Sequence, residues 1–185
     1  MLKRLAVAAL VLPFLAACGA TPNPGDSVER DQLHQRVLAS INDFRGVDPS
    51  IDRFIKSAHA YAVFPRILTA AVGVGGAHGN GEVFENGKLV GYSDVSQGNI
   101  GVQLGAQRYA EIIFFENEGA FIDFKYATTE FDARATAIAA SRGAAATADY
   151  RRGVIIFTLP ETGLMAQAAI GGQKFRFEPI VTSRR

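Results

Sequence analysis

The sequence predicts an α+β domain in which two short helices precede a strongly curved antiparallel sheet. The curvature of this sheet can extend to a barrel-like form. Apolar residues recur every three or four positions between residues 27 and 58, which is typical of amphipathic helices. From residue 60 onward, short apolar stretches rich in glycine alternate with turn signals, which is typical of strands. No repeat of solenoid length occurs, so we expect one domain over residues 27–185.

The segment before this domain has the features of an export signal. Lys3 and Arg4 precede a short apolar run that ends in Leu15-Ala16-Ala17-Cys18, and the run is too short to span a bilayer. This ending resembles the lipobox of bacterial lipoproteins, which implies a signal peptide over residues 1–17 and lipid attachment at Cys18. Gly19 in place of an aspartate favours, by the same resemblance, the outer membrane. The alternative is that Cys18, the single cysteine, is a free or intermolecular thiol.

Residues 18–26 contain prolines and small residues, so we expect them to form an acylated tether without regular structure. Helical spacing then begins at Ser27 and ends near Gly46, and Asp48-Pro49 provides the N-cap and first residue of a second helix. These helices either insert into a membrane or pack on their own sheet. The mixed charge of their polar faces favours packing on the sheet.

Glu85-Asn86-Gly87-Lys88 is the clearest hairpin signal, because Asn-Gly is the preferred pair of a type I′ turn. The segments 108–116 and 153–159 are apolar on both faces, as expected of strands that are covered on each side. Residues 174–178 alternate strictly, which predicts a strand with Phe175 and Phe177 facing inward and the charged residues facing solvent.

Two further segments complete the expected fold. Asn117 can cap a short internal helix that ends at Lys125. The alanine-rich segment 133–148 is ambiguous, and we favour a strand with a break at Arg142-Gly143. We expect the helices to lie at one side of the sheet.

No motif in the sequence predicts catalysis, a cofactor or a metal site. The glycines between Gly73 and Gly81 do not form a complete phosphate-binding motif, and in a strand glycines more often mark curvature or close backbone approach. The three histidines, His34, His59 and His78, lack metal-ligand spacing. Carboxylates such as Glu111 have no partner identifiable from sequence. We therefore do not expect an enzyme, although an unrecognised hydrolase using His59 or His78 remains an alternative.

The charge of the chain is distributed unevenly. Residues 26–132 hold 9 Lys and Arg against 15 Asp and Glu, a balance of −6, whereas residues 133–185 hold 8 against 3, a balance of +5. A basic surface of this kind attracts anionic phospholipid at about 1 kcal/mol per residue. The candidate residues are Arg151, Arg152, Lys174, Arg176, Arg184 and Arg185. The alternative is that these cations are solvated or paired with acids of the other portion.

Several segments together resemble the SYLF lipid-binding domain family, also described as an actin-binding domain family. They are Ala60-Tyr-Ala-Val-Phe-Pro65, Val72-Gly-Val-Gly-Gly76, Gly98-Asn-Ile-Gly-Val-Gln-Leu-Gly105, Glu111-Ile-Ile-Phe-Phe115 with Asn117-Glu-Gly-Ala-Phe121, and the late Gly-Val-Ile-Ile-Phe strand. Their order and spacing match over most of residues 35–178. Eukaryotic members bind phosphoinositide-rich membranes and some bind actin, and bacterial relatives are commonly small exported proteins or lipoproteins.

Together, the lipobox resemblance and the SYLF resemblance imply an outer-membrane lipoprotein, facing the periplasm, that binds anionic phospholipid head groups. Tyr150-Arg151-Arg152-Gly153 occupies the place of the family's Ser-Arg-Gly segment, so Arg151 and Arg152 are the leading candidates for head-group contact, with Lys174 and Arg176 as further candidates. Neither actin nor nucleic acid is an expected partner of a protein in a bacterial envelope. The alternative function is an interaction lipoprotein that binds another envelope protein and has no lipid affinity of its own.

Overall fold

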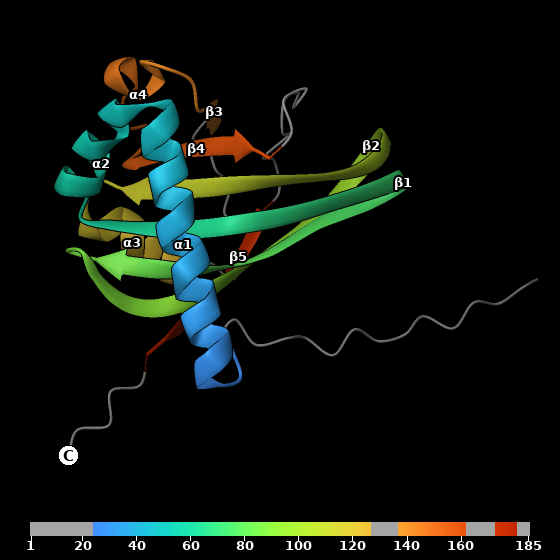
Figure 1. The fold of residues 1–185 in the computed structure, drawn as a ribbon, viewed down its shortest axis with the longest axis horizontal. Coiled ribbons are helices and arrows are strands. Elements are labelled where there is room, and N and C mark those ends of the chain that lie inside the picture. Colours follow the sequence, from blue (N-terminus) through green and yellow to red (C-terminus); the bar gives the residue numbers. More distant parts are fainter. Residues whose placement is uncertain (1–23, 127–136, 162–172, 181–185) are drawn as a thin grey trace, which may run out of the picture.

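The computed structural model describes residues 24–126, 137–161 and 173–180. Its helices are α1 (Ser27–Val47), the 3-10 helix η1 (Pro49–Ile51), α2 (Asp52–Ser57), α3 (Glu118–Tyr126) and α4 (Ala144–Thr147). Its strands are β1 (Ala60–Glu85), β2 (Lys88–Phe115), β3 (Ala137–Ala139), β4 (Val154–Pro160) and β5 (Gln173–Pro179). The α+β class predicted from the sequence is confirmed (Figure 1).

The strands form one mixed sheet in which β2 is the central element. The strand order is β1-β2-β4-β3. β5 also pairs with β2, along residues 91–97, whereas β4 pairs with residues 109–115 of β2. The short β3 is parallel to β4, so the prediction of a purely antiparallel sheet was wrong. Within the described residues the sheet is not closed into a barrel, so the barrel-like form is also not supported.

The two N-terminal helices form where the sequence predicted them, and their ends have identifiable caps. The side chain of Asp26 accepts a hydrogen bond from the backbone of Glu29 at 2.8 Å, and Asp48 does the same for Ser50 at 3.1 Å. α1 then crosses the sheet with Leu33, Val37 and other apolar residues buried beneath it (Figure 1). The prediction that these helices pack on their own sheet is confirmed.

The predicted hairpin joins β1 to β2. Glu85 and Lys88 are paired across the turn, and Asn86 and Gly87 both have positive φ, at 51° and 74°, as a type I′ turn requires. The two strands are far longer than the sequence indicated, with 26 and 28 residues. Register shifts at Phe64/Ile67 and Val72/Val74 mark where this hairpin bends.

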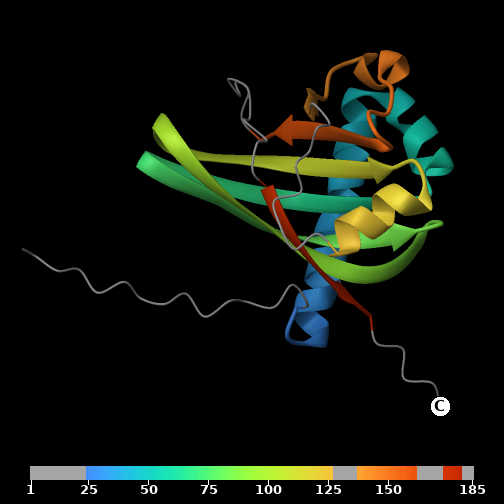
Figure 2. The ribbon, with the colours of Figure 1, turned by 180° about the vertical axis from the view of Figure 1, so that it is seen from behind.

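The hairpin bends back on itself, so its turn returns to the start of β1 (Figures 1 and 2). The backbone N–H of Asn86 donates to the carbonyl oxygen of His59 at 3.0 Å. A Cβ atom at Gly79 would lie 2.6 Å from the carbonyl oxygen of Arg66, and one at Gly81 would lie 2.4 Å from that of Val63. Any larger residue at these two positions would collide with backbone, so glycine permits the close approach. The prediction that these glycines mark close backbone contact is confirmed.

Buried hydrophobic side chains cover both faces of the sheet. We call the cluster beneath α3 the inner core and the cluster beneath α1 and α2 the outer core. In β2, Ile113 and Phe115 belong to the inner core, whereas Ile112 and Phe114 belong to the outer core. This alternation explains the continuous apolar run that the sequence shows. Figures 1 and 2 show α1 and α3 on opposite faces, so the expectation that the helices lie at one side was wrong.

The alanine-rich segment was predicted only in part. Its first residues, 133–136, lie outside the described residues, and β3 covers only Ala137–Ala139. The break at Gly143 is confirmed by its φ of 81°, but the following α4 is helical where a strand was expected. Alanine favours a helix when no sheet neighbour is available, which accounts for the difference.

We expect Gly81→Ala to destabilise the fold by at least about 2 kcal/mol, because the added methyl group would meet the carbonyl oxygen of Val63 and the ring of Phe64. Urea unfolding measures this loss. Gly98→Ala is the matched control, because a Cβ at Gly98 meets no atom within 4 Å, and its effect should stay within about 0.5 kcal/mol. Equal stability of the two variants would contradict the assigned role of the close approach.

Candidate functional site

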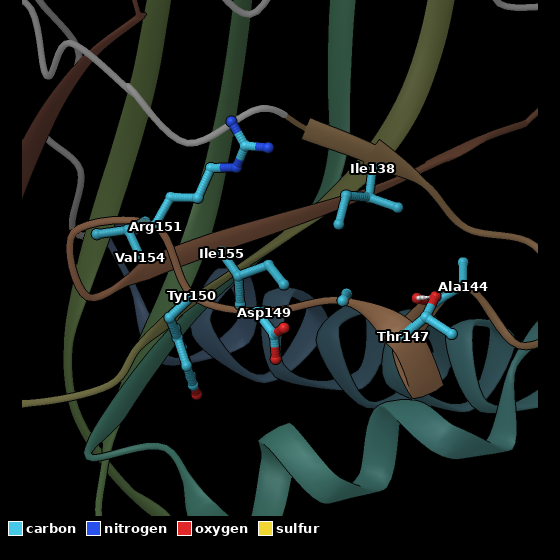
Figure 3. Close-up of a pocket in the computed structure, with 9 residues that line it drawn as sticks. Ile138, Ala144, Thr147, Asp149, Tyr150, Arg151, Val154 and Ile155 are labelled. Carbon is cyan, nitrogen blue, oxygen red and sulfur yellow. Dashed lines mark hydrogen bonds between the residues drawn. The ribbon is translucent and has the colours of Figure 1, made fainter.

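An open groove of about 650 Å³ lies where α4 faces β3 and the start of β4 (Figure 3). Its lining residues are Ile138, Ala144, Thr147, Ala148, Asp149, Tyr150, Arg151, Val154 and Ile155. Most of this lining is apolar, and Ile155 and Val154 are buried beneath it. Figure 3 shows Ile138 and Ile155 extending toward one another, while Arg151 and Asp149 lie on opposite sides of β4.

The wall formed by α4 is held by residues distant in the sequence. Asp48, which is buried, accepts a hydrogen bond from the backbone N–H of Ala145 at 2.7 Å and so caps this short helix. Burial alone would raise the pKa of Asp48, but hydrogen bonds from Ser50 and Ala145 outweigh it and lower the pKa. The carboxylate is therefore ionised at neutral pH and well placed to act as a cap.

Arg53 completes the attachment of this wall. Its guanidinium donates to the carbonyl oxygen of Ala145 at 2.8 Å and also to that of Ala148. Together with Asp48, it satisfies backbone groups at both ends of α4, which is too short to be stable alone. The groove therefore has a fixed wall.

Arg151 reaches the groove because of a tight turn. The backbone groups of Arg151 and Val154 are paired, at 2.9 and 3.1 Å, around Arg152 and Gly153. Both central residues have positive φ, at 53° and 77°, which is the conformation of a type I′ turn. This turn directs two exposed arginines to the end of the sheet beside the groove.

The other predicted cations lie on a different arm of the sheet. Lys174 and Arg176 are exposed on β5 and pair with Ser96 and Asp94 of β2, whereas β4 pairs with residues 109–115 of that strand. Arg176 also donates to the Asp94 carboxylate at 2.9 Å. The four candidates are therefore not one cluster, and of them Arg151 lines the groove. Cys18, Arg184 and Arg185 lie outside the described residues.

A second polar group, which the sequence did not identify as a site, lies within the inner core. Glu111 and Gln173 are both fully buried, and the amide nitrogen of Gln173 donates to Glu111 Oε2 at 3.2 Å. Glu111 Oε1 is also buried, and no described residue donates a hydrogen bond to it. Burial raises the pKa of Glu111 to about 7, and that of Tyr109 is raised for the same reason. The sequence analysis named Glu111 but could not identify its partner, because Gln173 is 62 residues away in the chain.

The histidines contact carboxylates at the returning end of the hairpin. His34 Nδ1 lies 2.8 Å from Glu82 Oε2, and His59 Nε2 lies 3.1 Å from Glu85 Oε1. Within the described ranges, no group of three His, Cys, Asp or Glu side chains is placed to hold a metal ion. Both contacts join the end of β1 to preceding segments, so we assign them a structural role.

Comparisons with protein-family models and with curated proteins found no match. Among the helices of the described residues, none is both long and apolar enough to cross a membrane.

We expect Glu111→Gln to remove a pH dependence of stability. In the folded protein the pKa of Glu111 is about 7, against 4.5 for an ordinary glutamate. The protein therefore has its full free energy of unfolding below pH 4.5, where this carboxyl group is neutral in both states, and loses part of it as the pH rises to 7. The loss amounts to about 3 kcal/mol. Urea unfolding at pH 5 and pH 8 should show the variant gaining stability relative to the wild type at the higher pH.

The control for this measurement is Glu118→Gln, which changes an exposed carboxyl group on α3. It should retain the pH dependence of the wild type. If Glu111→Gln kept the same dependence, the buried carboxyl group would not be its source.

Proposed function

We propose that this chain is an outer-membrane lipoprotein, anchored through Cys18 and facing the periplasm, whose SYLF-like domain binds the head groups of anionic phospholipids. The sequence supports the anchor through its basic start, short apolar run and Leu-Ala-Ala-Cys ending. The resemblance to a lipid-binding family supports the activity of the domain.

The observation that carries the proposal is the groove beside Arg151. A phospholipid presents an anionic phosphate next to apolar chains, and this groove presents the exposed guanidinium of Arg151 next to apolar side chains, with the carboxylate of Asp149 on the other side of β4 (Figure 3). Guanidinium groups bind phosphate through paired, charge-assisted hydrogen bonds. The chemistry of the groove therefore fits a lipid better than a wholly polar ligand.

The cations differ in their expected contributions. Arg151 and Arg152 are both exposed at one tight turn, so they can face the same phosphate surface. Lys174 lies on another arm of the sheet, and Arg176 is engaged with Asp94. We therefore assign the main head-group contact to Arg151 and Arg152.

Reversal of both arginines to glutamate should weaken binding to anionic vesicles. Each cation near such a surface contributes about 1 kcal/mol, so the double variant should bind at least roughly 30-fold more weakly. The measurement is co-sedimentation of residues 26–185, produced without the lipid anchor, with vesicles of phosphatidylcholine and phosphatidylglycerol. Binding by the unchanged protein should require phosphatidylglycerol and weaken with salt.

The matched control reverses Arg36 and Lys88, which are also exposed, and so changes the net charge equally. It should bind more tightly than the arginine variant. Equal weakening in both variants would show that overall charge, and not the position of the arginines, determines binding. Unchanged binding in the arginine variant would show that the groove is not the binding site. No binding by the unchanged domain, together with capture of a stoichiometric envelope protein, would favour the interaction function instead.

A further inference from the structure

The outer part of the hairpin carries no charged side chain. We call residues 67–77 of β1 and 97–107 of β2 the hairpin bend; they contain no Asp, Glu, Lys, Arg or His. The two strands remain paired through this region, as the register of Ala71 with Gly105 and Val74 with Ile100 shows. Because one fifth of the chain is charged overall, 22 uncharged residues at one place in the fold require an explanation.

The hairpin bend extends beyond the rest of the domain. The close approach of Gly79 to Ile67 marks its base, and the strand runs about six residues, or roughly 20 Å, from there to its midpoint. Figures 1 and 2 show this part of β1 and β2 projecting past the helices. Near the base, Leu68 is 45% exposed and Ala70 is also exposed. A projecting strand pair without charged side chains, rather than the single exposed leucine, is the feature that indicates an interaction surface.

Cations surround the base of the hairpin bend. Arg66 precedes it in β1, Arg108 follows it in β2 opposite Leu68, and Lys174 is paired with the neighbouring Ser96. All three are exposed. One of them, Arg66, forms an ion pair with Glu161 at 3.2 Å. Apart from Thr69, Gln97, Asn99, Gln103 and Gln107, the bend consists of glycine and aliphatic residues. An uncharged, mainly aliphatic segment with Arg and Lys at its base matches the order of acyl chains and phosphates in a bilayer.

We propose that the hairpin bend inserts into the boundary between head groups and acyl chains of an anionic bilayer, with Arg66, Arg108 and Lys174 facing the phosphates. This inference rests on the proposed affinity for anionic phospholipid and names a second contact surface, because Arg151 and Arg108 lie near opposite ends of the paired segments of β2 and β4. Pairing of β1 with β2 satisfies the backbone groups on the facing edges of the two strands, and water and head groups at the boundary can satisfy those on the outer edges. A tether over residues 18–26 reaches about 30 Å, which is enough to bring this surface to the bilayer that holds Cys18.

The chain contains no tryptophan, so an introduced one reports on its own position alone. Leu68→Trp tests the hairpin bend, and Leu38→Trp on α1, where the native side chain is 41% exposed, is the matched control. Both are made in the full chain with Cys18→Ser, which prevents acylation, and are mixed with vesicles of equal parts phosphatidylcholine and phosphatidylglycerol. Tryptophan emission at position 68 should shift to shorter wavelength and be quenched by brominated acyl chains, whereas emission at position 38 should not.

Ala70→Trp gives a second reporter if Leu68→Trp unfolds the protein. In addition, Leu68→Glu should reduce the vesicle affinity of residues 26–185 roughly tenfold or more, whereas Leu38→Glu should not. Vesicle binding without a spectral change in the bend would overturn this inference and leave the proposed function intact. No vesicle binding by residues 26–185 would overturn both. A spectral shift that depends on protein concentration in the absence of vesicles would assign the bend to contact between two copies and overturn the inference.

Discussion

The close contact between the two halves of β1 is the constraint on which the rest of the structure depends. Gly79 and Gly81 have no side chain, so the backbone of the returning half can lie against Arg66 and Val63. That approach brings the turn at Asn86 to His59. It also divides β2 into two segments, one that pairs with β4 and one that pairs with β5. A hairpin that remained straight would leave no enclosed face for the inner core.

Two hydrophobic cores follow from this arrangement, and a buried carboxyl group lies in one and beside the other. Glu82 lies next to the outer core and contacts His34 of α1, whereas Glu111 lies within the inner core and contacts Gln173 of β5. Burial raises the pKa of both carboxyl groups, although the hydrogen bond from His34 opposes the change in Glu82. Each carboxyl group thus joins the hairpin to a segment that packs on it. At each, ionisation of the buried carboxyl group would destabilise the folded state.

The sequence predicted those elements whose signals are local. The caps at Asp48 and Asn117, the turn at Asn86-Gly87 and the alternation in β5 each depend on neighbouring residues, and the structure has all of them. The glycines predicted curvature or close backbone approach, but not which segment they would meet, because the contact of Gly81 with Val63 depends on a bend between them. The parallel β3 and the helical α4 were missed for the same reason, since alanine adopts whichever structure its neighbours in space support. Of the predicted head-group candidates, Arg151 lines a groove whose other wall is attached by Asp48 and Arg53, two residues that no local pattern connects to it.

The attachment of α4 by residues so far away in the chain has a consequence for folding kinetics. Asp48 is separated from Ala145 by 97 residues, and Arg53 is separated from Ala148 by 95, so these bonds can form only after long loops have closed. Contacts at such separation slow the folding of a domain. We therefore expect the groove to form late, after the hairpin has taken its shape. In a newly made chain this segment would remain open to proteases and chaperones for longer than the helices at its beginning.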